Sequence, residues 1–278
     1  AKHFLCTDYE FLTAGTVRMG SSSAIAFFQS LQQLLQVCVT QIILPDKKIL
    51  VGGFSSFATP QFKWQGLLHK YAADGTLDSS FAVNGEVDSN LLAGNWVIMK
   101  LALQPDGKIL AIGFYDFSFI GMLARFEANG DLDSSFGSNG VTIIDYSTLP
   151  YDATRVDDFA LLPDGKILIC GIVDDGGLYQ SYVSRYTSSG NLDSTFTNGG
   201  ILDLQLPSNY DFSAETMQVR PDGKILLSGY SRGGIGERMM LVRLLANGNF
   251  DQTFGTNGVV RHAPYISEWV QKILLLPN

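Results

Sequence analysis

Short apolar segments alternate with turns rich in Gly, Pro and Asn along nearly the whole chain. The segments "VIMKLALQ" (97–104) and "KILAIGF" (108–114) are apolar and β-branched, and the Pro-Asp-Gly between them sets a tight turn. A third segment, "GMLARFE", runs into Asn129-Gly130, and a fourth, "VTIID", follows Gly140. The pattern predicts units of four short β-strands joined by turns.

This unit repeats. Its first marker is Pro-Asp-Gly-Lys or a variant of it, at Pro45 ("PDKK"), Pro105, Pro163, Pro221 and Pro277 ("PN"), with spacings of 60, 58, 58 and 56 residues. Its second marker reads "YAADGTLDSSFAVNG" in the first copy and occurs four times. Four strands in a unit of about 58 residues is typical of a β-propeller blade, so an all-β propeller is expected.

The ends of the chain complete one another in this alignment. The last copy, "KILLLPN", stops at its first turn, and "AKHFLCTDY" at the N-terminus matches "GKILLSGYS", with Lys2 on Lys224. We therefore expect one domain, residues 1–278, folded as a five-bladed propeller with four antiparallel strands per blade. Residues of about 265–278 and 1–30 would share one blade, which removes exposed sheet edges. An open array cut from a longer chain is the alternative.

Composition and charge restrict the classes of partner that the protein can bind. The chain is 46% hydrophobic and only 17% charged, as expected of a packed protein. Its net charge of -8, without a basic cluster, disfavours nucleic acid, and its apolar runs are too short for a transmembrane helix, so we expect no membrane insertion. A monomer is expected. Cys6, Cys38 and Cys170 lack metal or redox spacing and are predicted to be free thiols, which leaves the cytoplasm open as a compartment.

The paired markers resemble the delta-60 repeat family of bacterial tandem repeats, with the pattern PDGKIL...G...ARYxxxGxLDxxFGxxG, over nearly the whole chain. One departure is Leu244, where the other copies have Tyr71, Phe126 and Tyr186. The resemblance implies an exported or cell-surface bacterial protein without assigned chemistry.

Two sets of connections vary between copies. The second and third strands are joined by segments such as "SSFATPQFKWQ" and "YDFSFI", and successive blades are joined by segments such as "QLPSNYDFSAE". In an up-and-down blade both sets emerge on the same face. Variable loops on a rigid scaffold are where binding residues concentrate, so this face is the candidate recognition surface.

Aligning the first strands on their prolines predicts a candidate site in this face. Trp96, Arg155 and Trp269 fall near the channel mouth, and Asp157 and Glu215 fall at one level, shared with Val39, Met99 and Gln271. The loop aromatics Tyr115 and Tyr210 add contact area for a ligand. Paired carboxylates at about 5 to 9.5 Å can hydrolyse glycosides. Alternatively, Asp157 and Glu215 simply face Arg155, Lys100 or Lys272.

The second marker carries one Asp in each copy: Asp78, Asp133, Asp193 and Asp251. One carboxylate per blade without calcium-loop spacing does not make a metal site, and no cofactor motif is present. These residues are predicted to act in turns or to pair with the repeated cations Lys70, Arg125, Arg185 and Arg243. The lysine of Pro-Asp-Gly-Lys is interpreted as a solvated flank.

These observations favour a non-catalytic module that binds protein or carbohydrate through Trp96, Arg155, Asp157, Glu215, Trp269, Tyr115 and Tyr210. The alternatives are a propeller-type glycoside-active enzyme that uses Asp157 and Glu215, and a structural repeat segment of a larger surface protein. Fold analogy alone does not decide between them.

Overall fold

The structure is a computed structural model. It describes residues 10–13, 15–18, 35–57, 63–87, 94–115, 120–144, 146, 153–174, 179–197, 199–206, 211–232, 238–262 and 273. These residues form β-strands and turns without a helix, so the all-β prediction is confirmed. Accordingly, the described part of the chain has no helix long and apolar enough to cross a membrane.

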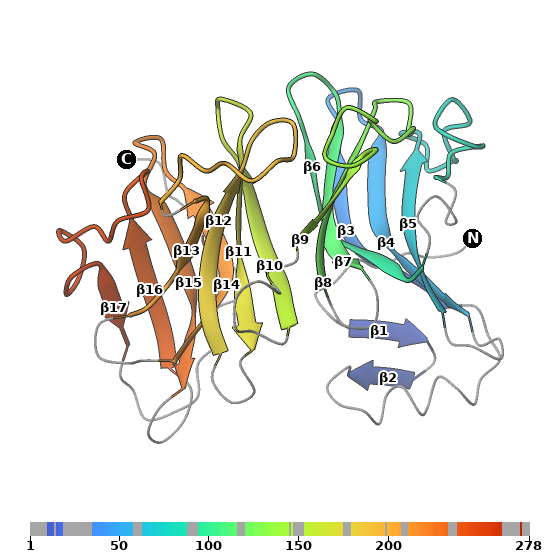
Figure 1. Cartoon of the computed structure of the whole chain (residues 1–278). Helices are drawn as coiled ribbons and strands as arrows, with labels where there is room; N and C mark the ends of the chain where they lie inside the picture. Colours follow the sequence, from blue (N-terminus) through green and yellow to red (C-terminus); the bar gives the residue numbers. More distant parts are fainter. Residues whose placement is uncertain are drawn as a thin grey trace. The chain divides into compact units, whose positions relative to one another are not determined.

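The strands form antiparallel sheets in chain order, one for each of the four repeat units that carry both markers (Figure 1). The first has three strands: β3 (Leu35–Ile43), β4 (Ile49–Phe57) and β5 (Lys63–Tyr71). The second has four: β6 (Trp96–Leu103), β7 (Ile109–Tyr115), β8 (Ile120–Phe126) and β9 (Val141–Ile144).

Two further four-stranded sheets follow. One contains β10 (Ala153–Leu161), β11 (Ile167–Asp174), β12 (Tyr179–Tyr186) and β13 (Ile201–Asp203). The other contains β14 (Asp211–Val219), β15 (Ile225–Arg232), β16 (Arg238–Leu244) and β17 (Val259–Arg261). A separate hairpin joins β1 (Glu10–Thr13) to β2 (Gly15–Arg18).

The strand register fixes which connections share an end of a sheet. In the third sheet Ala153 pairs with Asp174, and Asp174 pairs with Tyr179, so β10 begins beside the connection from β11 to β12. At the other end Leu161 pairs with Ile167 across the Pro-Asp-Gly turn. The variable connections therefore lie at one end of the sheet, which we call the variable-loop end, and the repeated turns lie at the other, the turn end.

The turns form as their residues predict. Gly107 has a φ of 85°, and its amide donates to the Gln104 carbonyl at 2.9 Å, which closes the Pro-Asp-Gly turn. In the first copy Lys47 takes this position with a φ of 67°, a left-handed conformation that is unfavourable for a side chain other than glycine.

The chain divides into two compact units, each with its own core. The first comprises residues 1–118, 122–134 and 139–141, and the second comprises residues 119–121, 135–138 and 142–278. The core of the first unit includes Leu50, Leu68 and Ile98. The core of the second unit includes Val183, Leu227 and Val242. All six side chains are fully buried. Burial of these apolar side chains is the main contribution to the stability of each unit.

Neighbouring sheets within a unit are joined by a repeated aromatic contact. A Cβ on Gly130 would lie 3.0 Å from the ring of Phe81, and one on Gly248 would lie 3.2 Å from the ring of Phe196. Both phenylalanines come from the second marker of one repeat, and both glycines from the turn of the next. The recurring Leu-Asp-x-x-Phe and Asn-Gly segments thus have a packing role that links successive repeats.

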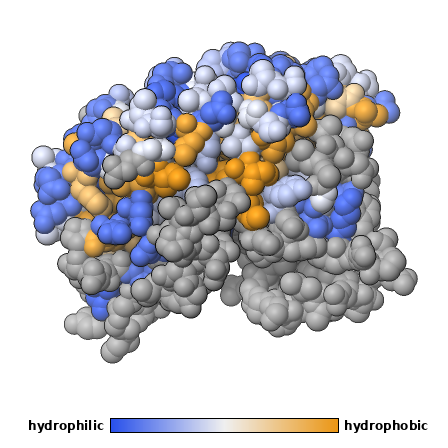
Figure 2. Space-filling view, in the orientation of Figure 1, coloured by the Kyte–Doolittle hydropathy of each residue, from blue (hydrophilic) through white to orange (hydrophobic). Residues whose placement is uncertain are grey.

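The described surface in Figure 2 is mostly hydrophilic, with apolar side chains in small groups. Among the residues that the structure describes, the exposed large apolar side chains are Ile43, Leu77, Val83, Ile143 and Leu192. Cys170 is free and buried, as predicted. The prediction of free thiols is wrong for Cys38, which is disulfide-bonded.

Candidate functional site

The first strand of each three- or four-stranded sheet has a β-bulge at the same place. The register shifts between Cys38 and Thr40 in β3 and between Ile98 and Lys100 in β6. It shifts in the same way between Val156 and Asp158 in β10 and between Ala214 and Thr216 in β14. The residues left out of the pairing are Val39, Met99, Asp157 and Glu215. The level that the sequence aligned is therefore the equivalent bulge position of each of these sheets, and bulges re-aim side chains.

A glycine of the second strand makes each bulge sterically feasible. In β11 a Cβ on Gly171 would lie 2.0 Å from the Arg155 carbonyl oxygen, and in β15 one on Gly229 would lie 1.8 Å from that of Ser213. Gly53 and Gly113 face Val37 and Val97 in the same way at 1.8 and 1.7 Å. The glycine five residues after each Lys of Pro-Asp-Gly-Lys was the signal for the bulge that sequence reasoning missed.

The bulges of β10 and β14 bring three of the predicted site residues together. Arg155 Nε lies 2.8 Å from Asp157 Oδ1, and an Arg155 terminal nitrogen donates to Glu215 Oε1 at 3.3 Å. The Arg155 and Glu215 side chains are 38% and 35% exposed, so both are accessible to a ligand, whereas Asp157 is 14% exposed. Burial lowers the pKa of Arg155, but the carboxylates of Asp157 and Glu215 outweigh it, and the pKa is raised.

The other predicted residues lie elsewhere or outside the described residues. Trp96 is 1% exposed, and its ring lies where a Cβ on Gly66 would be, at 2.0 Å, so it fills the core of the first unit. Tyr115 pairs with Trp96 across β6 and β7 and packs against the same core. Tyr210 and Trp269 lie outside the described residues, as do most of the variable connections.

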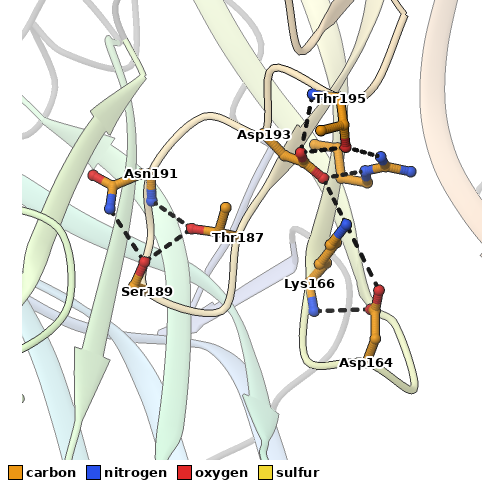
Figure 3. A network of polar contacts seen from close by, with 8 residues as sticks. Asp164, Lys166, Thr187, Ser189, Asn191, Asp193 and Thr195 are labelled. Atoms are coloured by element: carbon orange, nitrogen blue, oxygen red, sulfur yellow. Dashed lines mark hydrogen bonds and ion pairs between the residues drawn. The ribbon is translucent and has the colours of Figure 1, made fainter.

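The turn end carries a repeated ion-pair network (Figure 3). The Asp193 carboxylate accepts a hydrogen bond from Arg185 Nε at 2.7 Å and lies 3.0 Å from Lys166 Nζ, while its other oxygen accepts from Thr195 Oγ1 at 2.6 Å. These hydrogen bonds, from Thr195 first, hold the pKa of Asp193 well below its ordinary value. The predicted pairing with the repeated cation is confirmed here.

The other three repeats contain the same network. Their Asp–cation pairs are Asp78 with Lys70 at 3.9 Å, Asp133 with Arg125 at 2.6 Å and Asp251 with Arg243 at 2.8 Å. The lysine after each Pro-Asp-Gly turn also contacts the Asp: Lys48 at 2.9 Å, Lys108 at 2.7 Å and Lys224 at 3.0 Å. The interpretation of this lysine as a solvated flank is therefore wrong, because the hairpin turn lies beside the second marker.

These arrangements differ in what they can do chemically. The Asp of the turn-end network has its oxygens engaged by cations and a hydroxyl, which makes it a structural clasp. The group formed by Arg155, Asp157 and Glu215 has accessible hydrogen-bond donors and acceptors, which a site that recognises a polar ligand requires. The described residues contain no group of three or more His, Cys, Asp or Glu side chains that could hold a metal ion.

Comparison with known families adds an independent observation. The model of a family described as "Domain of unknown function (DUF5122) beta-propeller" matches residues 44–81, 104–136, 162–196 and 220–254, together half of the chain. Each match begins one residue before the Pro of a Pro-Asp-Gly-Lys marker or its variant and ends at the Phe of the second marker. The matched segments therefore contain the hairpin turn and the ion-pair network of each repeat.

A solved structure, the extracellular domains 1–2 of Drosophila Semaphorin 1b, is similar to 83% of this chain at 13% identity, with a TM-score of 0.43. The similar region is 45% of that chain, so the present chain corresponds to less than half of it. No curated protein matches the sequence.

Proposed function

We propose a function from the premise that the chain belongs to the DUF5122 beta-propeller family, whose model matches half of it. The β-propeller fold generally suggests a binding or interaction module. We propose that this protein is a non-catalytic module that recognises a protein or a carbohydrate at the variable-loop end of its sheets. Function has to be argued from a site, because one fold hosts many activities.

The observation that carries the proposal is the difference between equivalent bulge positions. Val39 and Met99 occupy the bulges of β3 and β6, whereas Asp157 and Glu215 occupy those of β10 and β14, beside Arg155. The scaffold tolerates apolar residues at this position, so the fold does not require the charges. Accessible Arg155 and Glu215 offer a donor and an acceptor side by side, which suits a ligand with adjacent hydroxyl or amide groups.

The finer architecture belongs to the same proposal. We propose a single domain over residues 1–278 with five blades, the last shared by residues of about 265–278 and 1–30, and a monomeric state. We also propose that the repeats are those of the delta-60 family and that the protein is an exported or cell-surface bacterial protein.

A glycoside-active enzyme is the alternative. It would use Asp157 and Glu215 as its carboxylate pair, and the contact of both with Arg155 brings them to one place. The same guanidinium is the partner that the non-catalytic interpretation expects for both carboxylates. A structural segment of a larger surface protein would need neither.

A binding screen of the intact protein against immobilised glycans and peptides tests the proposal. Arg155→Ala is compared with Arg220→Ala, because Arg220 is similarly exposed, at 39%, and pairs with Asp222 at 3.4 Å at the turn end. We expect a ligand whose affinity falls about tenfold in Arg155→Ala only, as for a lost hydrogen bond to a charged group. Equal affinity in both variants, or no ligand, contradicts the proposed site. Glycan cleavage that Glu215→Gln abolishes would establish the enzyme instead.

A further inference from the structure

The backbone of β14 is held on both sides of Glu215 by side chains of the preceding sheet. Ser181 Oγ donates to the Phe212 carbonyl at 2.5 Å and accepts from the Ala214 amide at 2.8 Å. After Glu215, Asp158 Oδ2 accepts from Thr216 Oγ1 and from the Met217 amide, both at 2.8 Å. The Ser181 and Asp158 side chains thus hydrogen-bond to four groups of β14, two before Glu215 and two after it.

The bulge of β10 is held by a third side chain. The Tyr182 hydroxyl donates to the Arg155 carbonyl at 3.2 Å, two residues before the bulged Asp157. Asp158, which follows Asp157, also accepts from the Phe159 amide through Oδ1 at 2.8 Å. Ser181, Tyr182 and Asp158 are 1%, 2% and 8% exposed, so these hydrogen bonds are shielded from water. We call these three residues the bulge clamp.

The first unit provides an internal comparison. Registering β3–β5 on β10–β12 puts Gly66 at the position of Ser181, Leu67 at that of Tyr182 and Thr40 at that of Asp158. There the next sheet packs through the Trp96 ring against Gly66, without an equivalent of the Ser181 hydroxyl. Two propeller-like sheets therefore pack together without the clamp.

Stability alone does not explain why polar side chains are buried between the β10–β13 and β14–β17 sheets. Burying a hydroxyl or carboxylate is unfavourable unless it is hydrogen-bonded, and an apolar replacement of similar volume is often as stable. What a fully satisfied polar network adds is a single defined geometry. Here that geometry is imposed on the residues that flank Arg155 and Glu215 and, among the described residues, on no equivalent pair in the first unit.

We infer that Asp158, Ser181 and Tyr182 are positioning residues that hold Arg155 and Glu215 in a fixed arrangement for a ligand. This inference rests on the proposed function. A positioning role explains why the charged bulge residues and the bulge clamp occur in the same unit. A recognition site gains affinity when its groups are already in place before binding, because less conformational entropy is lost.

The test uses the chemical reactivity of arginine on the full chain without any ligand. Phenylglyoxal modifies accessible guanidinium groups, and mass spectrometry gives separate rates for Arg155 and for Arg220. Arg220 immediately follows β14, is similarly exposed, and among the described residues pairs with Asp222 alone, so it is the internal control. In the unaltered protein we expect Arg155 to react about tenfold more slowly, since two carboxylates hold it.

Ser181→Ala and Tyr182→Phe are measured separately, because each removes only one hydroxyl and with it the hydrogen bonds of one clamp residue. We expect each to raise the Arg155 rate severalfold while the Arg220 rate stays unchanged. An Arg155 rate that does not change in either variant overturns the inference. Rates that rise together at both arginines also overturn it, because they show general loosening of the sheet.

This experiment is independent of the binding screen. A screen without ligands would contradict the proposed function even if the Arg155 rates change as expected. Unchanged rates would contradict the clamp even if a ligand is found.

Discussion

The repeated Asp of the second marker shows what single residues contribute. Its pairing with the cation eight residues earlier was predictable, because the two positions recur together in every copy. The contact with the lysine of Pro-Asp-Gly-Lys was missed, because that lysine lies 25 to 30 residues away and meets the Asp only after the strands pair. Its recurrence beside a turn that needs no lysine was the available signal.

Loss of the Asp193 carboxylate should destabilise the second unit. Asp193→Ala leaves Lys166 and Arg185 without their shared partner, at a cost of about 2 kcal/mol in the free energy of unfolding. Asp164→Ala is the control, because Asp164 is 57% exposed, lies 3.9 Å from Lys166 Nζ and otherwise accepts a hydrogen bond from the exposed Lys166 amide at 3.1 Å, so its loss should cost about 1 kcal/mol or less. Urea unfolding measures both. Equal losses would contradict the role given to the clasp.

The equivalent ion-pair network of the first repeat, around Asp78, predicts that the stability of the protein depends on pH. Hydrogen bonds from Ser80, and then Lys48, lower the pKa of Asp78 from 3.8 to about 2. Between these values the unfolded chain binds more protons than the folded one, so stability should rise with pH in this window. The contribution is fully present above pH 4 or so and is lost as the pH falls through about 2. Asp78→Asn should flatten the acid limb of a stability curve. An unchanged slope would count against the assignment.

At the scale of the elements, the strands and turns followed from the sequence but the bulges did not. Alternation of apolar and polar positions specifies strands, yet an inserted residue changes only the pairing, which depends on the partner strand. The alignment put Asp157 and Glu215 at one level correctly, without showing that they leave the ladder there. Trp96, expected near a ligand, fills the space over Gly66, which only packing between sheets reveals.

The glycine opposite each bulge should be the least replaceable of its hairpin. A Cβ on Gly113 would lie 1.7 Å from the Val97 carbonyl oxygen, so Gly113→Ala should cost about 3 kcal/mol through forced backbone movement. Gly107→Ala in the same hairpin meets only the Ala128 methyl group at 3.8 Å and should cost about 1 to 2 kcal/mol, for its left-handed φ of 85°. Thermal and urea unfolding compare the two. A larger loss for Gly107→Ala would contradict the bulge geometry.

At the scale of the whole molecule, the repeat predicted the successive antiparallel sheets and the propeller family. Periodicity is a strong signal because each unit must bury the same faces against its neighbours. Ring closure and the number of blades depend on residues 1–9 and 274–278, which lie outside the described residues, and stay predictions.

A truncation tests the shared blade. If residues 1–30 complete the blade begun by residues 265–278, removing them should expose the C-terminal segment. Hydrogen exchange followed by mass spectrometry should then show that amides of residues 265–278 lose protection, while β10–β12 keep theirs. Unchanged protection at the C-terminus would favour an open array.

The most direct measurement of the central claim is where a ligand binds on the protein. With the ligand that the screen identifies, amide chemical-shift mapping by NMR should show its largest changes at residues 155–157 and 213–216 and in the adjoining variable connections. The Pro-Asp-Gly turns at the opposite end of the sheets should show little change. Shifts concentrated at those turns, or an unperturbed Arg155 bulge, would contradict recognition at the variable-loop end.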